Sequence, residues 1–224
     1  MSAFARVKAV MFDLDNTLVV RRSTLERLAQ YVTRFYFPEE LQRHAQIQAQ
    51  FCECFISGYD RRRECFEQFC AQTGLSGKVD YDDFLEMWSF YYPYCTVREP
   101  SAKAVLELKR RGYDISILTN GPSVMQNAKI DVVGIRDWFP TIVVSGEIGV
   151  EKPDPRAFWI ACEKTGFSPE ETVYVGDYDR NDIAGARSAG MPTIWFGAYM
   201  QWNDAIPRAD AEIDSLWQLL DIFK

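Results

Sequence analysis

Short apolar runs recur along the chain, each bounded by polar residues or glycine. Such runs are typical of strands that are buried on both faces of a parallel sheet. We predict five strands, at residues 7–12, 115–118, 142–144, 173–175 and 193–196. Between them, apolar residues recur at helical spacing and end at a glycine, at residues 101–111, 155–165 and 179–189. The alternation of strands and helices predicts an α/β fold with a doubly wound parallel sheet.

The first two predicted strands are separated by far more residues than one crossover helix requires. The intervening segment is predicted to be helical throughout. Ser23 and Glu26 have the spacing of a capping box at a helix start, and further amphipathic stretches begin near Pro38, Arg62 and Tyr81. Four such helices can pack as a small bundle. We therefore predict a core domain at residues 1–17 and 97–224 and an inserted helical domain at residues 18–96.

Composition narrows the classes of function. The chain has 224 residues, of which 47% are apolar, and its 25 basic and 32 acidic side chains give a net charge of −7. This charge argues against a nucleic acid polymer as partner, and no apolar run is long enough to predict a membrane span. Six cysteines in a chain of this length are typical of a reduced, cytoplasmic protein. We expect a monomer or a homodimer.

Polar residues follow four of the predicted strands. Ligands of open parallel sheets bind beyond the carboxyl ends of the strands, so these residues are expected to share one edge. The residues are Asp13, Asp15, Thr119, Asn120, Ser145, Lys152, Asp177 and Asp182. Asp13 and Asp15 alternate along an extended segment and so point to the same side, which brings two carboxylates near Asp177. Clustered carboxylates need a cation, and oxygen ligands favour Mg²⁺, while Lys152 can hold an anion such as a phosphate.

These segments resemble the four motifs of the haloacid dehalogenase-like hydrolase superfamily. The matching residues are Phe12-Asp13-Leu14-Asp15-Asn16-Thr17-Leu18, Leu118-Thr119-Asn120-Gly121, Lys152 within Glu-Lys-Pro-Asp-Pro, and Gly176-Asp177 with Asp182 five residues on. In that family a Rossmann-like core carries a helical cap inserted just after the first motif. The helical insertion is predicted at the same place in this chain, so the motifs and the predicted elements agree.

The resemblance implies roles for the residues that match the motifs. Asp13 attacks phosphorus and forms an aspartyl-phosphate, which water then hydrolyses. Asp15 serves as the acid and then the base, so nearby negative charge and partial burial are expected to raise its pKa. Thr119, Asn120 and Lys152 hold the phosphoryl oxygens. Tyr174, inside a predicted strand, is interpreted as a packing residue.

The resemblance also implies a metal site. Mg²⁺ is expected to bind the carboxylates of Asp13 and Asp177 and the backbone carbonyl of Asp15. Asp182 is expected to be a ligand, either through water or as support for the other ligands. The chain is thus predicted to be a Mg²⁺-dependent phosphatase of a small phosphate ester, of the nucleotide, sugar phosphate or phosphoglycolate type. A cap favours metabolites over larger substrates.

Three alternatives remain: a phosphomutase, a 2-haloacid dehalogenase, and a non-catalytic binding protein of the same fold. Dehalogenases of the family generally lack an acid at the position of Asp15 and need no metal, so Asp15 and Asp177 argue against that activity. A binding protein is expected to have lost the nucleophile, the acid or the lysine, and all three are present. Many relatives carry another acidic residue after the first motif, where this chain has Val19-Val20-Arg21-Arg22, and this leaves the substrate subgroup open.

Overall fold

The computed structural model describes residues 3–56, 62–89, 94–97, 101–198 and 200–224. The chain divides into two compact units. The first, here called the core unit, comprises Met1–Val19 and Val97–Lys224, and the second, the cap unit, comprises Val20–Thr96. The cap unit lies within the insertion predicted at residues 18–96. None of the described helices is both long and apolar enough to cross a membrane.

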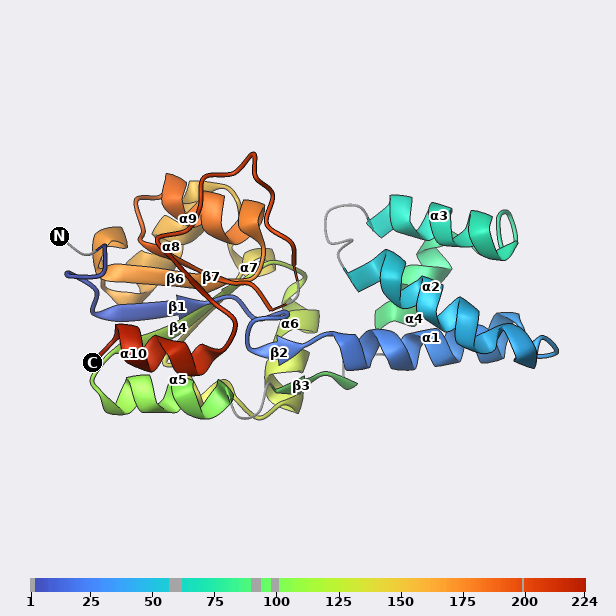
Figure 1. The fold of residues 1–224 in the computed structure, drawn as a ribbon, viewed down its shortest axis with the longest axis horizontal. Helices are drawn as coiled ribbons and strands as arrows, with labels where there is room; N and C mark the ends of the chain where they lie inside the picture. The colour runs from blue at the N-terminus through green and yellow to red at the C-terminus, as the bar shows by residue number, and fades with distance from the viewer. Residues whose placement is uncertain (1–2, 57–61, 90–93, 98–100, 199) are drawn as a thin grey trace. The chain divides into compact units, whose positions relative to one another are not determined.

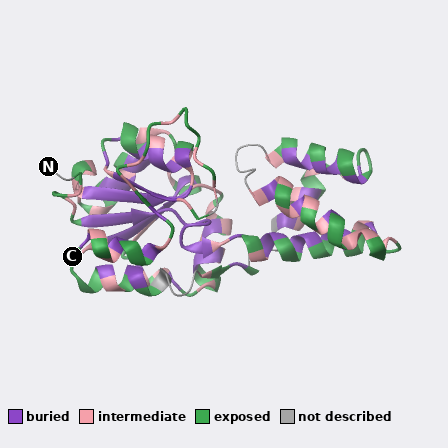
Figure 2. Cartoon of the chain, in the orientation of Figure 1, coloured by how far each residue is buried: buried purple, intermediate pink, exposed green. Residues whose placement is uncertain are grey.

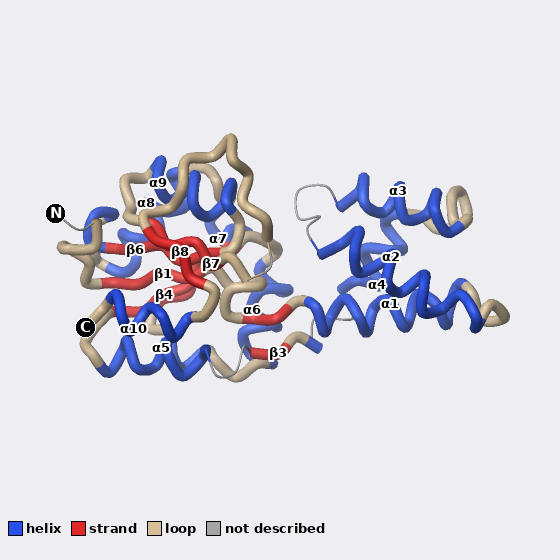
Figure 3. The backbone as a smooth tube through the Cα atoms, viewed as in Figure 1, coloured by secondary structure: helices blue, strands red, loops and turns tan. Residues whose placement is uncertain are grey.

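The core unit is built on a six-stranded sheet (Figure 3). The strand order is β5-β4-β1-β6-β7-β8, and each neighbouring pair is parallel. The strands are β1 (Ala9–Phe12), β4 (Asp114–Thr119), β5 (Thr141–Val144), β6 (Thr172–Gly176), β7 (Thr193–Phe196) and β8 (Ala211–Ile213). The five predicted strands and the α/β fold are therefore confirmed. Strand β8 is not predicted, because the three residues Ala-Glu-Ile form no apolar run.

Helices cover both faces of this sheet. Helices α5 (Ser101–Arg110) and α10 (Leu219–Ile222) lie on one face, and α8 (Pro155–Thr165) and α9 (Gly185–Ser188) lie on the other (Figure 1). The remaining helical segments are α6 (Ser123–Val132), α7 (Ser145–Ile148), η3 (Arg136–Trp138), η4 (Pro169–Glu171), η5 (Asp179–Ala184) and η6 (Leu216–Gln218). This layering is the doubly wound arrangement that the sequence predicts.

The interior of the core unit is dominated by the sheet. All four residues of β1 have no exposed surface, in keeping with their central place between β4 and β6 (Figure 2). The Tyr174 ring of β6 packs edge-to-face against Phe158 of α8, with ring centroids 5.0 Å apart. Burial of these apolar side chains fixes the strand ends from which the polar residues project.

The helix predicted at residues 179–189 has two parts. Its first part, η5, is a π-helix, and the α-helix α9 follows it. The Tyr178 carbonyl accepts from the N–H of Asp182 at 2.9 Å and from that of Ile183 at 3.3 Å, and this second bond widens the turn. Asp182 therefore lies in a π-turn, a feature that apolar spacing does not reveal.

The cap unit contains the four predicted helices. They are α1 (Arg22–Tyr36), α2 (His44–Ile56), α3 (Arg62–Thr73) and α4 (Tyr81–Ser89), with the short helix η1 (Leu41–Arg43) before α2. Aromatic rings form their core: the Phe51 centroid lies 4.6 Å from that of Phe55 and 5.3 Å from that of Phe69. Strands β2 (Val19–Val20) and β3 (Thr96–Val97) pair where the chain enters and leaves this unit.

The predicted capping box at Ser23 is wrong. Helix α1 begins at Arg22, so its N-cap is Arg21, two residues before Ser23, and Arg21 makes no side-chain capping bond. The Ser23 hydroxyl lies 3.3 Å from the carbonyl oxygens of Val20 and Tyr94 and can donate to either. One of these acceptors, the Tyr94 carbonyl, is 71 residues away in the sequence. The Ser23 hydroxyl therefore bonds backbone carbonyls and does not cap the helix.

Candidate active site

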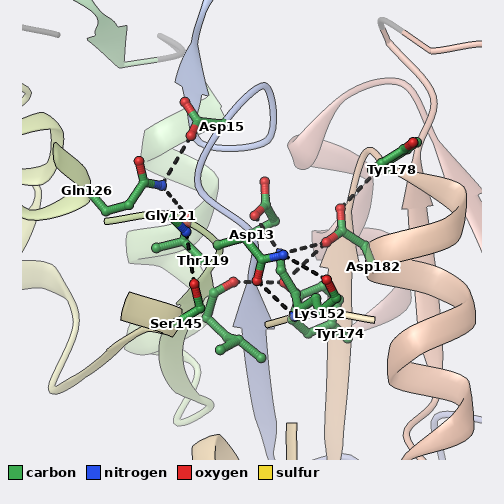
Figure 4. Close-up of polar contacts among 12 residues, drawn as sticks. Asp13, Asp15, Thr119, Gly121, Gln126, Ser145, Lys152, Tyr174, Tyr178 and Asp182 are labelled. Atoms are coloured by element: carbon green, nitrogen blue, oxygen red, sulfur yellow. Dashed lines mark hydrogen bonds and ion pairs between the residues drawn. The ribbon is translucent and has the colours of Figure 1, made fainter. Parts of the chain in front are cut away.

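The four predicted polar segments lie together at the carboxyl edge of the sheet (Figure 4). Asp13 directly follows β1, and its N–H donates to the Val175 carbonyl of β6 at 2.9 Å. At the next pair of strand ends, the Gly121 N–H donates to the Ser145 hydroxyl at 2.9 Å. Backbone geometry therefore places acidic, hydroxyl and amide groups from different strands at one edge.

Lys152 is a buried cation of this site. Its Nζ donates to Asp13 Oδ1, Asp182 Oδ1 and the Tyr174 hydroxyl, each at 2.7 Å (Figure 4). An ammonium group has three hydrogens, so these acceptors use all of them. The Tyr174 hydroxyl in turn donates to the Leu118 carbonyl at 2.8 Å. Tyr174 is thus a packing residue, as predicted, and also a partner of the site lysine, which was not predicted.

Three carboxylates surround a point suited to a metal ion. Oxygen atoms of Asp13, Asp177 and Asp182 all lie within 4.8 Å of one another. Asp177 Oδ2 is buried and has no hydrogen-bond partner among the described residues. Asp182 Oδ2 accepts from the Tyr178 N–H at 3.0 Å, so both of its oxygens are engaged. The open oxygen of Asp177 is therefore the most available for a metal.

The charges in this cluster oppose one another. Burial raises the pKa of Asp13 to about 7, although Lys152 beside it acts in the opposite direction. Burial also raises the pKa of Asp177 well above its ordinary value, and the negative charges of Asp13 and Asp182 add to that effect. Burial would lower the pKa of Lys152, yet the carboxylates of Asp13 and Asp182 raise it well above its usual range. A divalent cation would favour the charged carboxylates, so this donor set fits Mg²⁺.

Asn120 lies in the predicted segment, but its side chain holds the protein backbone. Its Nδ2 donates to the Lys152 carbonyl at 2.8 Å, and its Oδ1 accepts from the Lys152 N–H at 2.9 Å. Both polar ends of the amide are thus bound to one residue. The Asn120 side chain therefore positions Lys152, and its role in holding phosphoryl oxygens stays a prediction.

Asp15 lies in an environment that the sequence analysis did not foresee. Lys129 contacts both of its carboxylate oxygens, at 2.8 and 2.6 Å, and Gln126 donates to Oδ2 at 3.1 Å. The sequence led us to expect negative charge around Asp15, whereas the groups that contact its carboxylate are the ammonium of Lys129 and the amide of Gln126. The available signal was the spacing of Gln126 and Lys129 after the segment at Gly121, but helix α6, which carries them, was not predicted.

Comparison with known proteins agrees with this geometry. Residues 7–190 match the model of a family described as haloacid dehalogenase-like hydrolase. The chain belongs to this family. The family that the motifs resemble and the predicted hydrolase class are therefore both confirmed.

Three similar proteins illustrate the range of the family. A glyceraldehyde 3-phosphate phosphatase of Methanopyrus kandleri is 31% identical, and the match covers 97% of each chain. A solved HAD-hydrolase of Bacillus subtilis bound to magnesium is 25% identical, with a TM-score of 0.75, covering 98% of this chain and 99% of that one. A solved 2-haloacid dehalogenase of Pseudomonas syringae is 25% identical, with a TM-score of 0.62, covering 96% of this chain and 97% of that one.

Proposed function

We propose that this chain is a Mg²⁺-dependent phosphatase that hydrolyses a small-molecule phosphomonoester through an aspartyl-phosphate. The observation that carries the proposal is the contact of the buried Lys152 with Asp13, beside Asp177 Oδ2, which no described residue hydrogen-bonds. This arrangement offers a carboxylate nucleophile, a fixed cation for an anionic group and an oxygen cluster for a divalent ion. The similarity to a phosphatase of a small phosphate ester over 97% of the chain also supports it.

In the proposed reaction, a carboxylate oxygen of Asp13 forms a bond to phosphorus as the bond to the ester oxygen breaks. The leaving oxygen takes a proton from Asp15, which completes the first step. Water then attacks phosphorus, gives a proton to Asp15 and releases inorganic phosphate from Asp13. Lys152 and the Thr119 hydroxyl stabilise the phosphoryl oxygens through charge and hydrogen bonding.

The metal site belongs to the same proposal. Bound Mg²⁺ supplies positive charge that offsets the negative charge of the phosphoryl group. The carboxylates of Asp13 and Asp177 and the backbone carbonyl of Asp15 would hold it. Asp182 would be a ligand through water or a support for the other ligands, and its bonds to Lys152 and Tyr178 favour the supporting role.

Charge and cysteine chemistry support our proposals for the partner and the compartment. A net charge of −7 favours a small phosphate ester over a nucleic acid polymer as partner. The six cysteines are free thiols, and burial raises the pKa of Cys162 to about 11, which makes this thiol unreactive. We place the protein in the reducing cytoplasm, as a monomer or homodimer.

The direct test is phosphate release from a panel of nucleotides, sugar phosphates and phosphoglycolate, with Mg²⁺ and with EDTA. Asp13→Asn is expected to lower release by on the order of 10³-fold or more, since the nucleophile is lost. Asp137→Asn, at an exposed aspartate, is the matched control and should retain activity. Release that persists in EDTA would contradict the metal requirement.

The alternatives predict different products. A phosphomutase would isomerise a sugar phosphate with no net phosphate release, and a dehalogenase would release chloride from 2-chloropropionate. A binding protein would bind a phosphate ester and leave it unchanged. Any of these results without phosphate release would contradict the proposed phosphatase.

A further inference from the structure

Two buried side chains of helix α6 hold the Asp15 carboxylate. Lys129 Nζ lies 2.8 and 2.6 Å from its two oxygens, and Gln126 Nε2 lies 3.1 Å from Oδ2 (Figure 4 shows the Gln126 contact). The exposed fraction is 8% for Lys129, 2% for Gln126 and 6% for Asp15. Because water has little access to any of them, these contacts define where the carboxyl group lies.

The same pair reaches the predicted phosphate-binding hydroxyl. Gln126 Nε2 also donates to Thr119 Oγ1 at 2.5 Å, while Gln126 Oε1 accepts from Lys129 Nζ at 2.7 Å. Since the ammonium can only donate, it fixes which end of the amide faces Asp15 and Thr119. The Thr119 oxygen accepts this bond, so the hydroxyl keeps a hydrogen that can donate to an anion beside it.

Local backbone geometry makes room for this arrangement. Gln126 and Lys129 are three residues apart on α6, and so lie on one helix face. At Gly121, where φ is +136°, an added Cβ would lie 3.2 Å from Gln126 Cγ and Cδ. A glycine in the segment after β4 thus lets the glutamine side chain pass close to the backbone.

We propose that Gln126 and Lys129 are a positioning pair that sets the Asp15 carboxyl for proton transfer and the Thr119 hydroxyl for phosphate binding. The inference rests on the proposed phosphatase function. Neither residue is assigned a bond to the reacting atoms, so both act through Asp15 and Thr119. Proton transfer needs hydrogen-bond geometry first, and a carboxyl group that rotates freely would lose it.

Leaving-group dependence tests the pair. 4-Nitrophenolate leaves phosphorus without a proton, whereas the alkoxide of glycerol 2-phosphate needs one. In Lys129→Met, kcat/KM for glycerol 2-phosphate is expected to fall on the order of 10²-fold, and that for 4-nitrophenyl phosphate by less than about tenfold. This parameter covers only steps up to the first product release, so later hydrolysis of the aspartyl-phosphate does not obscure the comparison.

Two further variants separate positioning from folding. Lys129→Arg keeps the charge and two or more donors, and is expected to recover part of the glycerol 2-phosphate activity lost in Lys129→Met. Gln126→Leu removes the bond to Thr119 and is expected to weaken competitive inhibition by inorganic phosphate about tenfold, as for loss of a hydrogen bond to a charged group. Lys164→Met, at an exposed lysine of α8, is the matched control and should match the wild type in each assay.

The outcomes are distinct. Equal losses on the two esters, or no loss on either, in folded Lys129→Met would overturn the inference while leaving the phosphatase function in place. If Lys129→Met does not fold, the other two variants decide. The inference would be overturned if Gln126→Leu keeps the wild-type inhibition by phosphate and if both Gln126→Leu and Lys129→Arg keep the wild-type preference between the two esters. Wild-type protein that releases phosphate from neither these esters nor the metabolite panel would overturn the proposed function, and the inference with it.

Discussion

Asp182 can occupy its position only because Gly176, which lies against it, has no side chain. Gly176 ends β6, and a Cβ built there would lie 2.4 Å from Asp182 Oδ2 and 2.5 Å from its Cγ. The same carboxylate binds Lys152 Nζ and the Tyr178 N–H. A methyl group at Gly176 would therefore push Asp182 off Lys152, and Lys152 contacts the proposed nucleophile.

We expect Gly176→Ala to lower kcat by on the order of 10²-fold, the effect of a displacement of about 1 Å in an active site. Steady-state phosphate release with Mg²⁺ measures it, and circular dichroism checks that the fold is kept. Gly112→Ala is the control, because no atom lies within 4 Å of the added Cβ. The backbone at Gly112 has a φ of +92°, which is unfavourable for alanine. This variant should lose about 1 kcal/mol of stability and little activity, so equal activity loss in both variants would contradict the steric argument.

At the scale of elements, the cap unit is held together by aromatic packing between its helices. Phe51 of α2 has no exposed surface and contacts rings on two other helices, with centroids 5.3 Å from Phe69 of α3 and 6.2 Å from Trp88 of α4. Each helix has an apolar face but cannot bury it alone. Phe51 therefore packs against the apolar faces of two other helices and links α2, α3 and α4 in one core.

Phe51→Ala is expected to destabilise the cap unit by about 3–5 kcal/mol, since it removes a large buried side chain and leaves a cavity. Urea unfolding followed by tryptophan fluorescence measures the change, because Trp88 lies in the same cluster. Phe35→Ala removes the same ring from α1 at a residue that is 62% exposed, and should cost within about 0.5 kcal/mol. Similar losses in the two variants would mean that ring burial does not stabilise the bundle.

At the scale of the whole molecule, each unit has its own hydrophobic core. Units of this kind can open separately, with different free energies. In Phe51→Ala, hydrogen exchange is expected to accelerate in peptides from residues 20–96. Peptides from β1, β4 and β6 should keep wild-type exchange rates in the same experiment. Equal acceleration in both sets would show that the units unfold as one.

Much of the core unit was predictable because its signals are local. Strands β1, β4 and β6 each contain a short, nearly continuous apolar run, and the acidic and hydroxyl residues stand at the end of that run. A parallel sheet brings its strand ends to one edge, so Asp13, Thr119 and Asp177 were expected to be neighbours before any contact was known. The order of strands and helices along the chain therefore determined the fold class and the edge at which the polar residues gather.

The partners of those residues were decided by tertiary structure. Asp15 binds Lys129, 114 residues away, and Asn120 binds the backbone of Lys152, 32 residues away. Such pairs depend on where α6 and the loop before α8 pack, which no local pattern records. The Tyr174 hydroxyl likewise meets Lys152, 22 residues before it in the chain, only when the loop before α8 packs against β6. The sequence by itself determined the elements and the chemical groups at their ends, because both arise from neighbouring residues; only the packed fold decided which distant side chains those groups meet.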